Sequence, residues 1–288
     1  MVNFEVRPLS DALGAEIRGI DISKPLSSRT VKKIKEAWYK HLVILFRETE
    51  ISPKQQQAFA GNFGNIPLRP ENVSTKEEKK IGKTFMLVSN VRKNGKPIGS
   101  LPDGEMMFHS DRSYCEKPLK ATLLYAIEIP SKGGNTLFSN GYKAAETLPK
   151  KIITELKGKK ALHIYDYSSQ VKVNNVYDKT QHLNYAHPIF RKHPETGRSA
   201  LFVNELMTVE IIDIPNHESQ NLLEKLFAHQ KNREFIYEHK WKEGDLVMWD
   251  NRCCNHARTD FSTNERRMLR RVTVDEEFPV LPGNPSTT

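Results

Sequence analysis

The stretch Met106-Met-Phe-His-Ser-Asp111 decides which fold and which kind of site this sequence can form. Its three apolar residues lead into His109-Ser-Asp111, which predicts a strand that enters the core of the protein. Residues two apart on an extended strand point to the same side, so His109 and Asp111 would direct an imidazole and a carboxylate at one point. A His-x-Asp spacing by itself is weak support for a metal site.

A third ligand is available from His256, far along the chain. Two histidines and one carboxylate would bind one face of a metal ion and leave the opposite face open, as in non-haem Fe(II) oxygenases. A second His-x-carboxylate pair, His193-Pro-Glu195, falls in a turn by composition. Its side chains would not line up on a strand face, so we predict a structural role for it.

The segment from Glu265 to Val274, beyond His256, is predicted to be a strand rich in arginine. Alternation puts Arg267 and Arg271 on one face, and it puts Arg266 and Arg270 on the other. Whichever face is inward, two guanidinium groups go with it, and a buried guanidinium needs a partner anion. A dicarboxylate co-substrate that chelates the metal at one end would supply this anion at its far end. The alternative is an edge strand with solvated arginines.

The composition fits one globular domain over residues 1–288. The chain has 38% hydrophobic and 27% charged residues, and no internal repeat, low-complexity tract or linker composition stands out. No apolar run reaches the roughly 18 residues that span a bilayer, and the first residues lack the layout of a signal peptide. We therefore expect a cytoplasmic protein with no membrane partner. Its cysteines, Cys115, Cys253 and Cys254, are expected to be reduced packing residues.

The net charge is +9, from 44 Lys plus Arg against 35 Asp plus Glu. Much of the excess lies in short lysine runs within 76–83 and 150–160, which indicates a solvated basic surface. These charges are not interleaved with aromatic residues and belong to no known reading module, so we expect no nucleic-acid partner. A general attraction for small anionic substrates is expected instead.

Local patterns predict a mainly β protein. Apolar spacing predicts a helix over 28–41 and a buried strand over 41–46, and Ser52-Pro53 with Gln55 predicts the start of a second helix. Later elements are predicted at 218–227 for a helix and at 86–90, 106–111, 121–129, 135–139, 186–190, 200–204, 234–237, 245–249 and 266–274 for strands. Many strands, with helices before them or inserted between them, predict a jelly-roll core with helical cover.

Over nearly its whole length the chain resembles the Fe(II)/2-oxoglutarate-dependent dioxygenases of the taurine dioxygenase and 2,4-dichlorophenoxyacetate dioxygenase (TauD/TfdA) family. The similar motifs are Arg7-Pro-Leu, Leu13-Gly-Ala-Glu-Ile-Arg-Gly-Ile-Asp21, Ile44-Leu-Phe-Arg47, Phe63-Gly64, Phe108-His-Ser-Asp-Arg-Ser-Tyr114, Ile129-Pro-Ser-Lys-Gly-Gly-Asn-Thr136, His193-Pro-Glu-Thr-Gly-Arg198, and Trp249-Asp-Asn251 before His256. Several motifs in one order make the match specific, and it implies a double-stranded β-helix (jelly-roll) core.

The resemblance also implies cofactors and the residues that hold them. His109, Asp111 and His256 match the family's Fe(II) ligands. Thr136 and Arg267 match the residues that hold the distal carboxylate of 2-oxoglutarate, the co-substrate used together with O2. A planar guanidinium fork suits a carboxylate bidentately. The implied reaction is oxidation of a substrate C–H bond by hydroxylation or desaturation, with release of succinate and CO2, in a homodimer or homotetramer.

The substrate side is less defined by the motifs. Arg271 matches a second active-site arginine, which faces the substrate sulfonate in the taurine enzyme. Asn90 and Glu105 are expected near the substrate. Glu105 stands where the taurine enzyme has an asparagine, and Arg69 follows Phe63-Gly64 where that enzyme has histidines, so taurine is not the expected substrate. Arg69 would hold an anion and Glu105 an amine, or both are surface residues.

Two other classes of function fit parts of the sequence. The same three ligands would suit Zn2+ in a hydrolase, with water in the open position. That reading leaves Arg267 and Thr136 unexplained. A non-catalytic basic binding module would need no metal, and its binding to nucleic acid would depend strongly on salt.

Overall fold

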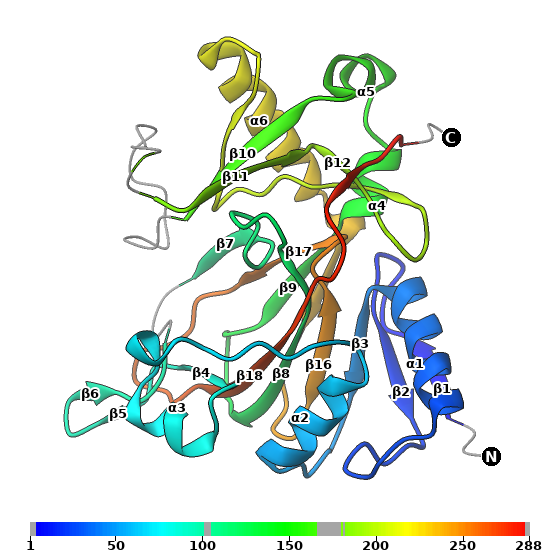
Figure 1. The fold of residues 1–288 in the computed structure, drawn as a ribbon. Coiled ribbons are helices and arrows are strands. Elements are labelled where there is room, and N and C mark those ends of the chain that lie inside the picture. Colours follow the sequence, from blue (N-terminus) through cyan, green and yellow to red (C-terminus); the bar gives the residue numbers. More distant parts are fainter. Residues whose placement is uncertain (1–3, 101–104, 166–179, 181, 286–288) are drawn as a thin grey trace.

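Two β-sheets of different size form the centre of the molecule in the computed structural model, which describes residues 4–100, 105–165, 180 and 182–285 (Figure 1). The larger sheet contains, in order, β1 (Glu5–Pro8), β2 (Ala15–Arg18), β3 (Val43–Phe46), β16 (Leu246–Asp250), β8 (Leu119–Glu128), β18 (Met268–Asp275) and β4 (Met86–Ser89). The smaller sheet contains, in order, β15 (Ile236–His239), β9 (Thr136–Asn140), β17 (Cys254–Arg258) and β7 (Met106–His109). Only the β2/β3 pair among these is parallel.

The inner faces of the two sheets pack against each other. One buried apolar cluster joins Val247, Trp249 and Leu269 of the large sheet to Phe138 and Cys254 of the small one. The ring centroids of Phe138 and Trp249 lie 5.4 Å apart. The two sheets therefore enclose one core between them, and the prediction of a mainly β fold with a layered core is confirmed.

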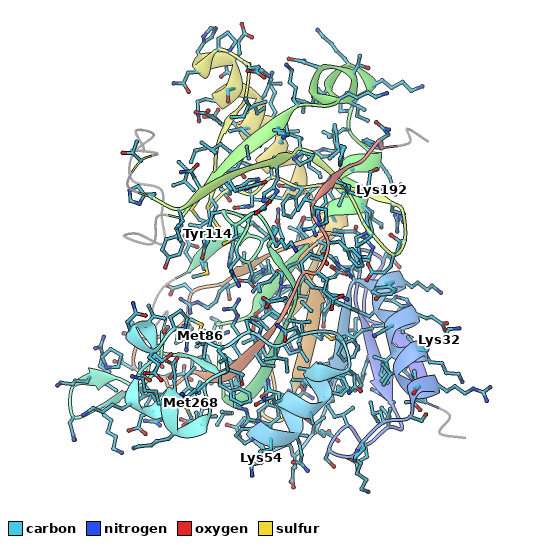
Figure 2. The ribbon with its side chains drawn as sticks, in the orientation of Figure 1. Lys32, Lys54, Met86, Tyr114, Lys192 and Met268 are labelled. Carbon is cyan, nitrogen blue, oxygen red and sulfur yellow. The ribbon has the colours of Figure 1, made fainter. Side chains whose placement is uncertain are left out.

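Two helices cover the outer face of the large sheet. Helices α1 (Ser28–His41) and α2 (Pro53–Gly61) begin where the sequence predicts, and Ser52 forms a capping box with Gln55. Helix α1 buries residues such as Trp38 in a second cluster with the outward side chains of β3, β16, β8 and β18. Lys32 and Lys54 lie on the exposed sides of these helices (Figure 2). The central strands β3 and β16 of the large sheet are thus buried on both faces.

A second layer of structure packs at one end of the two sheets. It contains the strands β10 (Lys160–Ile164), β11 (Asn184–Pro188), β14 (Thr208–Ile211), β12 (Phe190–Lys192), β13 (Ser199–Leu201) and β19 (Leu281–Pro282), with helices α4 (Gly141–Glu146), α5 (Lys150–Leu156) and α6 (Asn216–Gln230). A third apolar cluster joins these helices to β10, β12, β13 and β14. The sequence predicts α6 in part, over 218–227, but it does not predict α4 and α5.

Short elements complete the described chain. They are the 3-10 turns η1 (Glu71–Val73) and η2 (Arg233–Phe235), helix α3 (Lys76–Ile81), and the hairpin strands β5 (Arg92–Lys93) and β6 (Lys96–Pro97). Among the described residues no helix is long and apolar enough to cross a membrane. All three cysteines are free thiols, and Cys253 and Cys254 are buried.

Two expectations about strands differ from the structure. Strand β7 ends at His109, so Asp111 lies in the following turn and not on the same strand face. The arginine-rich strand β18 begins at Met268 and pairs with β8 on one side and β4 on the other, so it is not an edge strand. Its arginines are therefore not a row of solvated edge residues.

Candidate metal centre and co-substrate site

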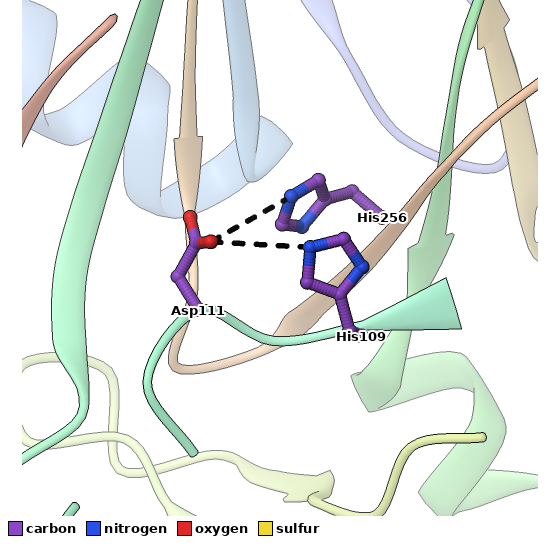
Figure 3. Close-up of side chains that lie close together, drawn as sticks. All are labelled: His109, Asp111 and His256. Carbon is purple, nitrogen blue, oxygen red and sulfur yellow. Dashed lines mark ion pairs between the residues drawn. The ribbon is translucent and has the colours of Figure 1, made fainter. Parts of the chain in front are cut away.

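Three side chains from two distant parts of the chain converge between the sheets. His109 at the end of β7 and His256 in β17 are cross-strand partners, and their ring centroids lie 4.0 Å apart. Nε2 of His109 lies 3.9 Å from Oδ1 of Asp111, and Nε2 of His256 lies 4.0 Å from the same oxygen (Figure 3). All three residues are buried. His109 at the strand end and Asp111 in the following turn therefore face one point, which was expected from alternation along a single strand.

The distances and the donor types fit one metal ion. A first-row metal such as zinc lies about 2.0–2.2 Å from nitrogen and oxygen ligands, so donors up to about 4 Å apart can share it. Nδ1 of His109 donates to the carbonyl oxygen of Met107 at 2.9 Å, which leaves the lone pair of Nε2 directed at Asp111. Burial lowers the pKa of His109 and holds the pKa of His256 well below its usual value. Both rings therefore stay neutral, which is the form that binds a metal.

His256 contains an unusual buried atom. Its Nδ1 is buried and has no hydrogen-bond partner among the described residues. An imidazole that neither pairs at Nδ1 nor reaches a hydrogen bond to Asp111 at Nε2 is not explained by packing alone. Ligation of a metal through Nε2 would account for its position.

A layer of hydrogen bonds holds the Asp111 carboxylate and its backbone in place. Thr122 of β8 donates its hydroxyl proton to Oδ2 of Asp111 at 2.5 Å, and Nδ2 of Asn251 donates to the Thr122 oxygen at 3.0 Å. Oδ1 of Asn251 accepts from the backbone N–H of Asp111 at 3.3 Å and from the Trp249 indole at 3.0 Å. These contacts fix the carboxylate so that Oδ1 faces the two imidazoles.

Arg271 places a cation directly against the ligand set. Its guanidinium lies 2.8 Å from Oδ1 of Asp111, with 19% of the side chain exposed. Burial alone would raise the pKa of Asp111, but Arg271, His256 and His109 outweigh it and hold that pKa well below its usual range. The carboxylate is therefore ionised, as a metal ligand must be.

Arg267 is a buried cation without a matching anion. Its side chain is 2% exposed, and its Nε donates to the Gly134 carbonyl oxygen at 3.1 Å. No carboxylate of the described residues pairs with it. Burial, together with the positive charge of Arg258, lowers the pKa of Arg267 to about 9. Thr136 begins β9 two residues after Gly134 and is also buried, so the structure brings this predicted pair into one neighbourhood.

The other predicted substrate residues do not all meet at the metal centre. Asn90 accepts from the Arg267 backbone N–H at 2.9 Å and donates to the Glu265 carbonyl oxygen at 2.8 Å, so it holds the backbone that carries Arg267. Arg69 forms a 3.0 Å ion pair with buried Glu78, which accounts for its position without a ligand. Glu105 is exposed directly before β7. Substrate contact by these three stays a prediction.

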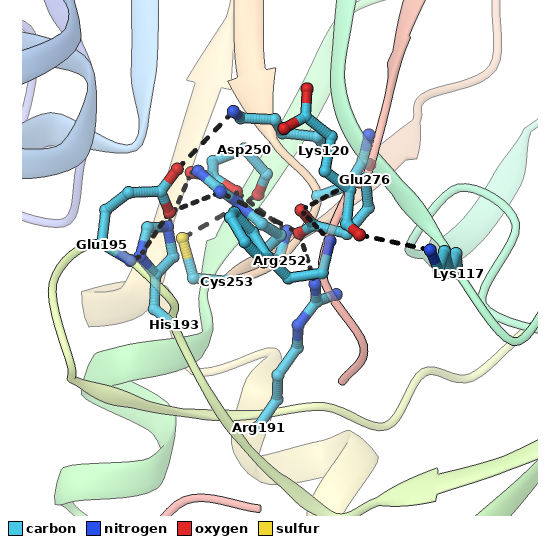
Figure 4. A network of polar contacts seen from close by, with 12 residues as sticks. Lys117, Lys120, Arg191, His193, Glu195, Asp250, Arg252, Cys253 and Glu276 are labelled. Atoms are coloured by element: carbon cyan, nitrogen blue, oxygen red, sulfur yellow. Dashed lines mark hydrogen bonds and ion pairs between the residues drawn. The ribbon is translucent and has the colours of Figure 1, made fainter. Parts of the chain in front are cut away.

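A second group of buried ionisable side chains contains His193 and is closed by its own contacts. Arg252 donates to both oxygens of Asp250 at 2.7 Å and to Glu195 at 2.6 Å, and His193 lies 3.0 Å from Asp250 (Figure 4). Nδ1 of His193 accepts from the backbone N–H groups of Glu195 and Thr196. Both ring nitrogens are used, which agrees with the structural role predicted for His193.

Comparison with known proteins places this geometry in a family. The model of the family described as "Taurine catabolism dioxygenase TauD, TfdA family" matches residues 5–273. The chain belongs to this family. The resemblance drawn from the sequence motifs is therefore confirmed.

Individual TauD/TfdA relatives match almost end to end. The alpha-ketoglutarate-dependent 2,4-dichlorophenoxyacetate dioxygenase of Cupriavidus pinatubonensis is 32% identical, covering 95% of this chain and 98% of that protein. The alpha-ketoglutarate-dependent sulfate ester dioxygenase of Pseudomonas putida is 30% identical, with 97% and 92% covered. The crystal structure of AAD-2 in complex with Mn(II) and N-oxalylglycine has a TM-score of 0.80 at 28% identity, with 97% and 100% covered. The double-stranded β-helix core is confirmed by this likeness.

Sequence reasoning missed residues that act through contacts between elements. Thr122 lies in the apolar run of β8, where a β-branched residue is ordinary, and only the pairing of the strands brings it to Asp111. Trp241 lies beyond β15, and its indole donates to the Thr136 hydroxyl at 3.0 Å. No local signal marks either residue, whereas Asn251 belongs to the Trp249-Asp-Asn251 motif.

Proposed function

We propose that this chain is an Fe(II)- and 2-oxoglutarate-dependent dioxygenase that oxidises a C–H bond of a small anionic organic substrate. The observation that carries the proposal is the presence, in one fold, of a His-Asp-His ligand set and of Arg267, a buried guanidinium that lacks a carboxylate partner among the described residues. A metal site alone would not require that cation. A site for a dicarboxylate co-substrate bound at the metal requires it.

His109, Asp111 and His256 would hold the iron on one face. Iron bound there would supply the activation of O2, coupled to oxidative decarboxylation of 2-oxoglutarate to succinate and CO2. The protein supplies orientation and a shielded site. Neutral imidazoles and an ionised carboxylate give the ligand set a single negative charge, and Thr122 keeps Oδ2 of Asp111 turned away from the histidines.

Arg267 and Thr136 would bind the distal carboxylate of 2-oxoglutarate. The guanidinium is fixed by its Nε bond to Gly134, which leaves its terminal nitrogens for a bidentate contact. Gly134 suits this close approach, because it has a φ of +63° and a Cβ there would lie 3.0 Å from the Arg267 side chain. An added methyl group at residue 134 would therefore disturb the anion site.

The position of Arg271 is one reason to propose an anionic substrate. It stands beside the ligand oxygen of Asp111 and is partly exposed, so its guanidinium can also meet a group outside the ligand set. The net charge of +9 favours the approach of anions. The names of the relatives include a dioxygenase of an aryloxy carboxylate and one of sulfate esters. Aryloxy carboxylates, sulfate esters and sulfonates are the proposed substrate classes, with hydroxylation, desaturation or cleavage of a C–O, C–N or C–S bond as outcomes.

The proposal also covers the domain organisation, the assembly and the partners of the protein. We infer one domain, a homodimer or homotetramer, and small-molecule partners without nucleic acid or membrane. The support for the assembly is the family resemblance alone, and measurement of the molar mass in solution tests it directly.

The test is a substrate screen with two readouts. Purified protein with Fe(II), 2-oxoglutarate and O2 is offered the three substrate classes, and succinate release and O2 uptake are measured. We expect substrate-dependent succinate with matching O2 uptake. Conversion of a sulfate ester with Zn(II) and no 2-oxoglutarate would instead establish the hydrolase, because that reaction needs water alone.

A further inference from the structure

The buried hydroxyl of Thr136, two residues after the Gly134 that binds Arg267, has no acceptor for its proton among the described residues. Trp241 donates its indole N–H to Oγ1 of Thr136 at 3.0 Å, and the two residues are 7% and 4% exposed. An indole N–H is only a donor, so the hydroxyl oxygen is the acceptor in this bond. No described residue accepts the proton of Thr136. A buried donor without an acceptor is uncommon, and it points to a ligand that supplies the acceptor.

The position of this hydroxyl matches that of an incoming anion. Thr136 lies two residues after Gly134, whose carbonyl oxygen accepts from Arg267. Arg258, another buried guanidinium, is the cross-strand partner of Thr136. A carboxylate attracted by these charges would find the free hydroxyl proton at the same place.

The indole ring of Trp241 is itself held in place by packing. The ring of His239 packs edge-on against it, with centroids 4.5 Å apart and planes at 89°. Nε2 of His239 lies 3.1 Å from Asp245, which also forms a 2.8 Å ion pair with Arg47. Trp241 also lines an open pocket of about 510 Å³ together with residues such as Asn135 and Thr259. A ring braced in this way cannot easily turn its N–H elsewhere.

We propose that Trp241 is a positioning residue for the co-substrate: its N–H occupies a lone pair of the Thr136 hydroxyl and thereby directs the hydroxyl proton at the distal carboxylate of 2-oxoglutarate. The inference rests on the proposed function. A free threonine hydroxyl rotates among several partners, and fixing it in advance removes part of the entropic cost of binding. Its effect should fall on the distal carboxylate, because the hydrogen bond of Trp241 goes to Thr136 and not to a metal ligand.

Equilibrium binding to the Mn(II)-loaded protein tests this without turnover. Affinities are measured for 2-oxoglutarate and for 2-oxovalerate, which has the same chain length but lacks the distal carboxylate. We expect Trp241→Phe to weaken 2-oxoglutarate about three- to tenfold and to leave 2-oxovalerate unchanged. Trp38→Phe is the matched control, since the buried indole nitrogen of Trp38 has no partner among the described residues. It should change neither affinity.

A second substitution separates positioning from packing. In a Thr136→Val background, which lacks the hydroxyl, Trp241→Phe should cause no further loss of 2-oxoglutarate affinity. An equal loss for both ligands, a full loss in the Thr136→Val background, or no loss at all would overturn the role of Trp241. If the unmodified protein bound 2-oxoglutarate no more tightly than 2-oxovalerate, the proposed function itself would fail.

A third measurement needs no substitution at Trp241, in case the phenylalanine variant does not fold. Zn(II) replaces Mn(II) so that proton resonances stay sharp, and the indole N–H signals of the three tryptophans are followed by NMR. The Trp241 signal should shift when 2-oxoglutarate binds and should stay in place when 2-oxovalerate binds. Equal shifts with both ligands would overturn the proposal.

Discussion

Two buried polar clusters lie near each other in this fold, and they differ in how many of their polar atoms have partners. In the Asp250 network, which consists of Asp250, Arg252, His193 and Glu195, both oxygens of Asp250 and all three guanidinium nitrogens of Arg252 have partners. The neighbouring Arg191 binds Glu276 through Nη2, but its Nε and Nη1 have no partner among the described residues. In the metal cluster of His109, Asp111 and His256, the imidazoles face a carboxylate oxygen at 3.9 and 4.0 Å, and one ring nitrogen has no partner. Both clusters contain enough donors for a metal ion.

The difference teaches how to tell a structural cluster from a functional one. Burying a charge costs free energy unless it is paired, so in a cluster that serves stability each buried charge has an opposite charge beside it. A cluster that serves chemistry keeps donors without partners, because the ligand completes them. The guanidinium of Arg252 also occupies the place next to Asp250 where a cation would bind.

One turn contributes a residue to each of the two clusters. Asp250 ends β16 and bonds Arg252 and His193, while the next residue, Asn251, bonds the backbone of Asp111 and the hydroxyl of Thr122. The Asp250 network therefore fixes the turn from which Asn251 reaches the metal cluster. Stability and site geometry are coupled through two adjacent residues.

The largest effect is expected from removing a ligand of the metal cluster. His109→Ala should abolish 2-oxoglutarate-dependent succinate formation while the protein stays folded, because the hydrogen bond that it loses is a local one to the Met107 carbonyl oxygen. His217→Ala, at an exposed histidine, is the control and should retain activity. Succinate release and the circular dichroism spectrum are the measurements. Retained turnover in His109→Ala would remove this histidine from the ligand set.

Breaking the Asp250 network should act on stability. Arg252→Ala leaves Asp250 buried without its cation, and we expect the free energy of unfolding to fall by about 3–5 kcal/mol in urea titrations. Arg266→Ala removes an exposed, solvent-screened pair with Glu128 and should lower the free energy of unfolding far less. Similar losses in the two variants would mean that the network is no more than surface pairing.

The co-substrate side of the metal cluster can be weakened separately. Arg267→Ala should lower 2-oxoglutarate affinity about 10- to 100-fold, because a charged hydrogen-bond donor is lost, and should leave Mn(II) affinity unchanged. Arg270→Ala is the control on the opposite face of the strand, where the side chain binds Gln56 and the Ile51 carbonyl oxygen. Isothermal titration of both ligands distinguishes them. Equal weakening of metal and co-substrate would place Arg267 elsewhere.

The smallest effect concerns the hydrogen bond behind Asp111. Thr122→Val keeps the side-chain shape but removes the donor to Oδ2, and we expect Mn(II) affinity to fall about tenfold. Thr273→Val on the neighbouring strand is the matched control. If both variants bind Mn(II) as the unmodified protein does, the orientation of Asp111 does not depend on Thr122.

Sequence reasoning found the residues whose chemistry is visible in the chain. His109, Asp111 and His256 were identified from residue type and motif order, and helices α1 and α2 from apolar spacing and a capping box. The position of Asp111 in a turn could not be foreseen, because alternation continues in the sequence after the strand has ended. Contacts set by strand pairing, such as that of Thr122, carry no local signal.

Arg69 shows a related limit. A cation in a polar stretch suggests that it binds a ligand, but Arg69 pairs with Glu78 instead. Glu78 is the buried residue of the lysine-rich helix α3, where the sequence would suggest a solvated acid. Helices α4 and α5 were missed because each has fewer than eight residues, too few for apolar periodicity to emerge. For Arg69 the deciding information is thus a tertiary contact, and for the two helices it is their short length.

Strand β7 stands at the edge of its sheet, with β17 as its one strand neighbour in the described part of the chain. An edge strand opens locally more readily than an inner one, and β7 with the turn after it carries two of the three ligands. Metal loading would clamp this margin to β17, so amide hydrogen exchange along 106–109 should slow far more than exchange in β9. The metal ion would then stabilise the edge of the smaller sheet in addition to its role in catalysis.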